Sequence, residues 1–166
     1  MFIKSLNILN KKYEIEGTIV GEVSTKEHYK EYVRIKKLIK INNLERQIKI
    51  YKNINHTNIA NFYRLNDFLV LPTSGDLAPI TIVEALGFGC MVLCSSSCGT
   101  KNYIRKNFNG YVFVHGDQKS LNKYMIKLIR NKEKFKSNLF KNKIIAKNLI
   151  GEKNFLKKFN SMVFDK

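Results

Sequence analysis

The stretch DFLVLPTSGDLAPITIVEALGFGCMVLCSS, residues 67–96, contains an apolar run, a polar loop, a helical pattern and a second apolar run. The apolar runs, 67–73 and 90–96, are short and rich in Val and Leu, which is typical of strands buried on both faces. The segment between them, 79–89, has a helical pattern and ends at glycine, a common helix stop. Strand, helix and strand in this order predict a unit of a parallel α/β sheet.

The same alternation continues on both sides of this unit. Further strands are expected at 17–21, 46–52 and 110–114, and helices at 2–12, 25–42, 56–66 (with Thr57 as its cap), 100–106, 120–131, 133–148 and 152–163. Alternating strands and helices imply right-handed crossovers and a doubly wound, Rossmann-like parallel sheet. We expect residues 1–150 to form this domain and residues 151–166 to form a C-terminal helix.

The chain has 166 residues and a net charge of +17, with 25 lysines and only five arginines. The lysines are spread along the whole chain, and Arg, which suits bidentate phosphate and base recognition, is scarce. We therefore favour a solvated, Lys-rich surface over a nucleic-acid-binding one, with weak attraction to acidic lipid as the alternative. No apolar run reaches the ~20 residues of a membrane span. The N-terminus does not resemble a signal peptide, so a cytoplasmic location is expected.

The three cysteines and three histidines are weaker candidates for chemistry. Cys90, Cys94 and Cys98 are spaced C-x3-C-x3-C, which is not a zinc-ribbon spacing, and they are interpreted as reduced packing thiols. The histidines, His28, His56 and His115, are scattered along the chain. The GFG sequence that ends at Gly89 follows a helix instead of a strand, so we interpret it as a helix stop and not a dinucleotide loop.

The loop and helix start at 76–82 have the properties of an anion site. Pro79 suits the first helical position, because its ring fixes φ and its missing N–H would have no helical partner there. The N–H groups of Ile80, Thr81 and Ile82 would then point outward at the positive end of the helix dipole. Such a helix start is a favourable seat for phosphate.

Two carboxylates flank this helix start. Asp76 lies in the loop before it, and Glu84 lies on the helix face that also carries Thr81. Carboxylates accept strong, charge-assisted hydrogen bonds from sugar hydroxyls. The predicted ligand is a nucleotide-sugar, with its phosphates at the helix and a sugar at each acid. Taken separately, Asp76 could be a turn residue and Glu84 a solvent-facing helix residue.

Residues 68–113 resemble the C-terminal, donor-binding half of the GT-B glycosyltransferases of the large retaining family four. That family has an E-x7-E motif after a strand ending in V-L-P-S, and here Asp76 and Glu84 stand at the two acids. EALGFGCMVL, 84–93, resembles the passage from helix to strand, and NGYVF, 109–113, the last strand.

The resemblance implies roles for the residues at these positions. Asp76 would be catalytic and face the donor sugar, and Glu84 would hold the ribose of the nucleotide. Pro79, Ile80 and Thr81 would bind the diphosphate, and Gly21, at the end of an earlier strand, is assigned to the same donor site. The implied reaction transfers a sugar, with retention, to a polysaccharide or glycolipid acceptor, and it needs no bound metal or other cofactor.

The sequence also departs from the family pattern. The first acid is Asp instead of Glu, Pro79 and Ile80 replace a common Phe-Gly pair, and Met91 replaces a proline. In the family, the domain begins with a central strand that precedes the helix expected here at 2–12. Without that strand, the strands at 17–21 and 67–73 would each have an unpaired edge.

These departures leave two functions open. One is a glycosyltransferase domain completed by an N-terminal-half polypeptide. The other is a non-catalytic fragment or partner subunit that binds donor or a companion chain without turnover. Self-association through the unpaired strand edges is a further expectation, as is peripheral contact of the basic C-terminal helices with an acidic membrane.

Overall fold

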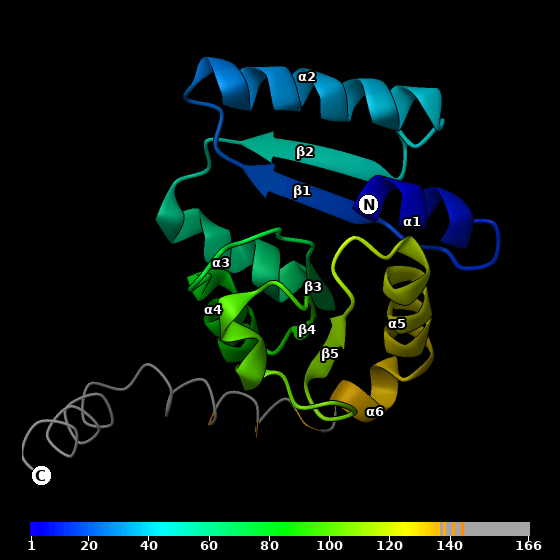
Figure 1. The fold of residues 1–166 in the computed structure, drawn as a ribbon, viewed down its shortest axis with the longest axis vertical. Coiled ribbons are helices and arrows are strands. Elements are labelled where there is room, and N and C mark those ends of the chain that lie inside the picture. Colours follow the sequence, from blue (N-terminus) through cyan, green and yellow to red (C-terminus); the bar gives the residue numbers. More distant parts are fainter. Residues whose placement is uncertain (137, 139–140, 142–143, 145–166) are drawn as a thin grey trace, which may run out of the picture. The chain divides into compact units, whose positions relative to one another are not determined.

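The computed structural model describes residues 1–136, 138, 141 and 144. The chain divides into two compact units, Met1–Phe62 and Tyr63–Lys166. Its elements are, in order, α1 (Phe2–Leu9), β1 (Gly17–Gly21), α2 (Lys26–Ile41), β2 (Ile48–Lys52), α3 (His56–Leu65), β3 (Phe68–Leu71), α4 (Ile80–Phe88), β4 (Met91–Ser95), η1 (Gly99–Tyr103), β5 (Gly110–Phe113), α5 (Gln118–Arg130) and α6 (Lys132–Lys136) (Figure 1). Helices and parallel strands alternate, so the predicted α/β class is confirmed.

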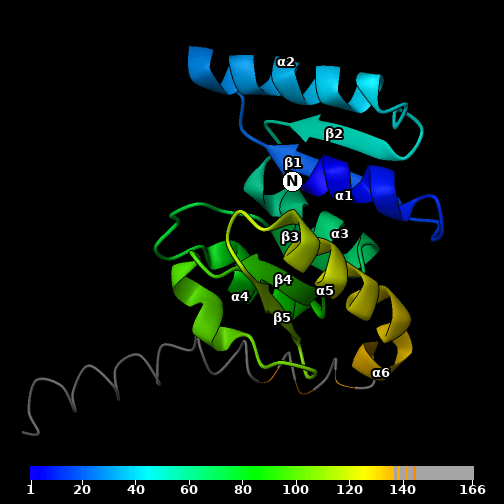
Figure 2. The same cartoon turned by 45° about the vertical axis from the view of Figure 1, so that its right-hand side comes forward.

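The first unit is built on two parallel strands. β1 pairs with β2 in a register that places Gly17 beside Ile48 and Gly21 beside Lys52. Helix α2 runs alongside these strands in both views (Figures 1 and 2). Helix α1 packs against the start of β1, where a Cβ on Gly17 would lie 2.7 Å from Leu6 Cδ1. The glycine therefore permits the close approach of α1 to the strand.

Side-chain caps fix where two helices begin. Thr25 precedes α2, and its hydroxyl accepts a hydrogen bond from the His28 N–H at 3.1 Å. The predicted cap of α3, Thr57, is wrong because the helix already begins at His56. Asn55 takes that role: its Oδ1 accepts a hydrogen bond from the Thr57 N–H at 3.2 Å. Asn is among the residues that best satisfy the first amides of a helix.

The second unit contains a parallel sheet of three strands in the order β3-β4-β5. Strand β4 is buried at all five positions, as its uninterrupted apolar run predicts. Helices α4 and α5 lie on either side of the strands (Figure 2). The predicted helix stop is confirmed, because Gly89 follows α4 in the left-handed conformation with φ of 90°.

The described strands form two separate sheets instead of one continuous sheet. Within the described residues, β1 pairs only with β2, and β3 pairs only with β4. The predicted unpaired edges of β1 and β3 are therefore confirmed. Most of the helix expected at 133–148, all of the helix expected at 152–163, and the boundary at 151 lie outside the described residues.

Candidate functional site

The candidate site is formed where β3 passes into α4 in the second unit. β3 ends at Leu71, an exposed loop follows, and α4 begins at Ile80. Because β3, β4 and β5 are parallel, their carboxyl ends lie at the same end of the sheet. Ligands of open α/β sheets commonly bind outside the carboxyl ends of the strands. The loop and the start of α4 are therefore in the position expected of a binding site.

Helix α4 begins one residue later than the sequence predicted. Pro79 is its N-cap, with φ of −63° and an extended ψ of 112°, so it stands outside the helix instead of at its first position. Pro79 gives no side-chain cap to the first amides. The first helical residues are Ile80, Thr81 and Ile82, the same three whose N–H groups were predicted to point outward. The first N–H groups of a helix lack intrahelical partners, so these remain the candidate donors for phosphate.

Two side chains at the start of α4 have unusual surroundings: an apolar one is exposed, and a polar one is buried without a hydrogen bond. Ile80 is 59% exposed although it is a large apolar residue. The hydroxyl oxygen of Thr81 is buried and has no hydrogen-bond partner within the described part of the chain. Buried hydroxyls are usually hydrogen-bonded, so the Thr81 hydroxyl is a polar group available to a ligand at the helix start.

Asp76 lies in the exposed loop before α4 and makes a local turn. Its Oδ1 accepts a hydrogen bond from the Ala78 N–H at 3.2 Å, and its own N–H donates to Thr73 Oγ1 at 3.1 Å. This is the Asx-type turn that the alternative interpretation predicted. The turn also fixes the orientation of the carboxylate, which has lone pairs left to accept further hydrogen bonds.

A second loop contacts the corner, the name used here for the loop between Leu71 and Ile80 together with the start of α4. The Gly99 N–H donates to the Asp76 carbonyl oxygen at 3.0 Å. A Cβ on Gly99 would lie only 1.7 Å from the Leu77 carbonyl oxygen, so no other residue fits there without a shift of the backbone. Thr100 Oγ1 donates to the Pro79 carbonyl oxygen at 3.4 Å. Sequence reasoning did not predict that Gly99 supports the Asp76 loop.

Glu84 is partly buried on α4, and a tyrosine binds it. The Tyr63 hydroxyl donates to Glu84 Oε2 at 3.0 Å. Burial raises the pKa of Tyr63 above its ordinary value, and the hydrogen bond to Glu84 raises it further. The alternative interpretation of Glu84 as a solvent-facing helix residue is therefore wrong, because the side chain is partly buried and bound by Tyr63. Sequence reasoning missed Tyr63, because its place in α3 gives no signal of the carboxylate it contacts.

The structure brings five of the six predicted site residues into one loop and one helix: Asp76, Pro79, Ile80, Thr81 and Glu84. The sixth, Gly21, belongs to the first unit. It is the last residue of β1, its carbonyl oxygen accepts from the Asn53 N–H at 3.1 Å, and a Cβ added to it would meet no atom within 4 Å. The backbone at Gly21 is thus open on the side where a side chain would stand.

The cysteines are buried free thiols. Burial raises the pKa of Cys90 and of Cys94 to about 12, which keeps both protonated and unreactive at neutral pH. The Cys90 thiol donates to the Tyr63 carbonyl oxygen at 3.0 Å. Among the residues that the structure describes, no group of three or more His, Cys, Asp or Glu could hold a metal ion.

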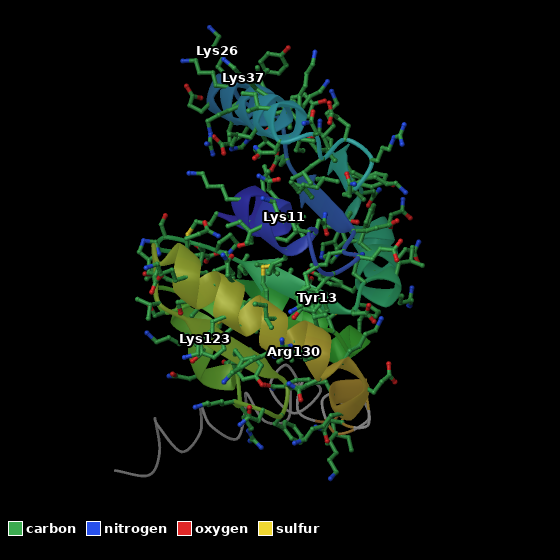
Figure 3. The ribbon with its side chains drawn as sticks, turned by 90° about the vertical axis from the view of Figure 1, so that its right-hand side faces the viewer. Lys11, Tyr13, Lys26, Lys37, Lys123 and Arg130 are labelled. Carbon is green, nitrogen blue, oxygen red and sulfur yellow. The ribbon has the colours of Figure 1, made fainter. Side chains whose placement is uncertain are left out.

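Basic side chains occur on both units. Lys26 and Lys37 on α2 and Lys123 and Arg130 on α5 belong to separate helices (Figure 3). This placement agrees with the spread of lysines along the sequence. In the described residues, no helix combines the length and the apolar character needed to cross a membrane.

Several solved structures have a fold similar to that of this chain. The chain is similar to sucrose-phosphate synthase from Thermosynechococcus elongatus, with a TM-score of 0.80, 18% identity, and coverage of 96% of this chain and 41% of that one. It is similar to HepE of Anabaena, solved in complex with UDP, with a TM-score of 0.79, 16% identity, and coverage of 97% and 45%.

A third similar structure is the C-terminal domain of LpcC, a glycosyl transferase group 1 family protein from Francisella tularensis. Its TM-score is 0.76 and its identity 19%, with coverage of 87% of this chain and 75% of that one. At these identities the likeness shows the fold. The chain spans less than half of the first two structures.

No curated protein matches this sequence. The model of the family described as Glycosyl transferases group 1 matches residues 1–144, which is most of the chain. Since the fold of the similar structures is that of GT-B glycosyltransferases, sequence and fold agree. This chain belongs to the glycosyl transferases group 1 family.

Proposed function

We propose that this chain is the donor-binding half of a glycosyltransferase. It holds a nucleotide-sugar while the sugar is transferred, with retention, to a polysaccharide or glycolipid acceptor. The observation that carries this proposal is the corner between β3 and α4 in a chain of this family. There, an acid in the loop and an acid on the helix flank amides that have no helical partners. The UDP complex of the similar HepE protein adds support for a nucleotide ligand.

Each part of the corner has a role in the proposed complex. The amides of Ile80 and Thr81 bind the diphosphate, and Pro79 sets where these amides begin. Glu84 accepts hydrogen bonds from the ribose hydroxyls. Asp76 faces the donor sugar, where its negative charge stabilises the positive charge that develops as the bond to the diphosphate breaks. Preorganised charges of this kind are commonly a large part of catalysis.

Gly21, in the first unit, is the remaining residue that the family resemblance assigns to donor binding. Its open backbone allows a ligand to approach the end of β1 closely. We expect no resident metal or other cofactor, as the family resemblance implies. Nucleotide-sugar binding should therefore persist after dialysis against EDTA. Binding that requires added Mg²⁺ or Mn²⁺ would contradict this part of the proposal.

Titration calorimetry tests the ribose role of Glu84. The diphosphates of uridine, guanosine, adenosine and cytidine, and their common sugar conjugates, are titrated into the purified chain. Glu84→Ala should weaken the tightest of these ligands by roughly tenfold or more, because it removes charge-assisted hydrogen bonds. Glu45→Ala is the matched control, since Glu45 is an exposed acid before the amino end of β2. Equal affinities for the Glu84 variant and the wild-type chain would reject the assignment.

Asp76→Asn separates binding from chemistry. The amide oxygen of Asn can still accept from the Ala78 N–H, so the turn is expected to persist. The loss of charge should leave nucleotide affinity within about twofold while it abolishes sugar transfer, because the charge acts on the reacting centre. Transfer at the wild-type rate by this variant would exclude a catalytic Asp76.

The second candidate is a non-catalytic partner that binds donor or a companion chain without turnover. The unpaired edges of β1 and β3 favour it, because such edges readily pair with another strand. A radiolabelled-donor assay, which follows both transfer and donor hydrolysis, distinguishes the two candidates. Turnover by the chain alone supports the first candidate. Donor binding without turnover supports the second, and turnover restored by an N-terminal-half polypeptide supports the two-chain form of the first.

We further propose that the protein is cytoplasmic and associates peripherally with an acidic membrane. The net charge of +17 supports this proposal. Co-sedimentation with vesicles that contain anionic lipid should be strong at low salt and weak at high salt. Equal recovery with neutral vesicles would contradict it. Nucleic acid is not expected as a partner, so a heparin or DNA column should not retain the chain at moderate salt.

A further inference from the structure

Tyr63 connects helix α3 to the proposed ribose-binding acid. It is a buried aromatic residue, 9% exposed, near the end of α3. Its hydroxyl donates to Glu84 Oε2 at 3.0 Å, across 21 positions of sequence. Both residues belong to the second unit, so the contact is internal to one compact body.

The tyrosine ring has little freedom to move. It stacks on Phe88 with a centroid distance of 5.7 Å and an interplanar angle of 11°. The Arg64 guanidinium lies over the Phe88 ring, 4.9 Å from its centroid. The Tyr63 backbone carbonyl accepts a hydrogen bond from the Cys90 thiol. Because the backbone and the ring are both held, the hydroxyl has a fixed position relative to α4.

A fixed donor restricts the carboxylate that accepts from it. A Glu side chain on a helix ordinarily samples several rotamers, and this freedom is lost when it binds a ligand. The hydrogen bond from Tyr63 holds one carboxylate oxygen, while an ionised carboxylate offers about four lone-pair sites in total. A tyrosine hydroxyl is protonated, and hence a donor, throughout the neutral range, and burial raises the pKa of Tyr63 further above that range.

We propose that Tyr63 is a positioning residue for the donor site: it fixes Glu84 in the orientation that receives the ribose hydroxyls of the nucleotide. This inference rests on the proposed function, because it gives Glu84 the ribose role. Tyr63 itself acts through Glu84. The alternative is that Glu84 only satisfies a buried tyrosine hydroxyl and stabilises the fold.

Tyr63→Phe removes the hydroxyl and keeps the stacked ring. Affinity is measured by calorimetry for the tightest of the UDP, GDP, ADP and CDP probes and for its 2′,3′-dideoxy counterpart. For the ribonucleotide, the variant should bind roughly five- to tenfold more weakly. For the dideoxy nucleotide, which has no ribose hydroxyls, the variant and the wild-type chain should bind equally. In a Glu84→Ala background, Tyr63→Phe should have no further effect on affinity.

Tyr111→Phe is a matched control. Tyr111 is also buried, at 3% exposed, stacks on Tyr124 at 5.0 Å, and donates its hydroxyl to Asn107 at 2.8 Å. Loss of this hydroxyl should change stability by a similar amount and leave nucleotide affinity unchanged. The stability of both variants is measured by urea unfolding, so that a general effect on folding is separated from an effect at the ribose.

The outcomes are distinguishable. If the wild-type chain prefers the ribonucleotide but Tyr63→Phe binds it equally well, the positioning role is wrong while the ribose site stands. If the variant loses affinity equally for both nucleotides, its role is structural and the inference is again overturned. If the wild-type chain binds no nucleotide, or does not distinguish the two sugars, the proposed ribose site fails and the inference fails with it.

Discussion

At the scale of single residues, Gly99 is the position where the site depends most on the absence of a side chain. Its Cβ would overlap the Leu77 carbonyl oxygen, and its N–H donates to the Asp76 carbonyl. The loop that carries Asp76 and the loop that carries Gly99 are therefore in backbone contact. Any side chain at Gly99 must push the two loops apart.

Gly99→Ala should lower the free energy of unfolding by about 2–3 kcal/mol, because the added methyl group meets backbone and not a flexible side chain. It should also weaken nucleotide binding through the displaced corner. Gly75→Ala is the control: this glycine lies in the Asp76 loop, and a Cβ there meets nothing within 4 Å. Urea unfolding and calorimetry measure the two effects. Similar stability of the two variants would show that the loops separate at little cost.

At the scale of elements, β4 carries the buried centre of the second unit. Its neighbours are β3 on one side and β5 on the other, and its five residues are all buried. Two thiols belong to this strand or precede it directly, Cys94 and Cys90. Burial disfavours the thiolate, which is why the pKa of both is raised from 9.0 to about 12.

These thiols make stability depend on pH in the alkaline range. Between pH 9 and about 12, the unfolded chain loses thiol protons that the folded chain retains. Their contribution is therefore fully present below pH 9 and is lost as pH rises through this window, with each thiol contributing a slope of about 1.4 kcal/mol per pH unit. Urea unfolding in reductant should show a steeper decline for the wild-type chain than for the Cys90→Ala/Cys94→Ala double variant. Parallel declines would contradict the assignment to these thiols.

At the scale of the whole molecule, the described strands form two open parallel sheets, whose edge strands are β1 and β2 in one sheet and β3 and β5 in the other. Parallel sheets in α/β proteins usually have their strands paired within a larger sheet, and unpaired edges are sites of association. The edges of β1 and β3 are two of the places where a further strand would add backbone hydrogen bonds, and they are the two that the family resemblance leaves without their central strand.

Hydrogen exchange resolved by residue tests this description. In the isolated chain, amides of β4 should exchange most slowly, because β4 is paired on both sides. About half of the amides of β1 and of β3 should exchange quickly, since alternate N–H groups of an edge strand lack a partner. If instead all amides of β1 or β3 exchange slowly, and their protection increases with protein concentration, the edges pair between copies of the chain.

Over the described residues, the sequence alone determined the order of the strands and helices and the location of the passage from β3 to α4. The strand at 17–21, the buried strand β4 and the helix stop at Gly89 follow from local patterns, because apolar periodicity and glycine conformation act over a few residues. Helix starts were less exact: Pro79 is the N-cap of α4 instead of its first residue, and Asn55, not Thr57, caps α3.

The tertiary structure decided what surrounds the two acids. The hydrogen bond from Tyr63 to Glu84 and the close approach of Gly99 to Leu77 join segments about 20 residues apart. No local pattern encodes them, because each depends on how a helix or loop packs after the chain has crossed the sheet. The placement of Asp76 in a loop and of Glu84 on a helix could therefore be predicted from sequence, whereas the groups that contact them are set by packing between elements.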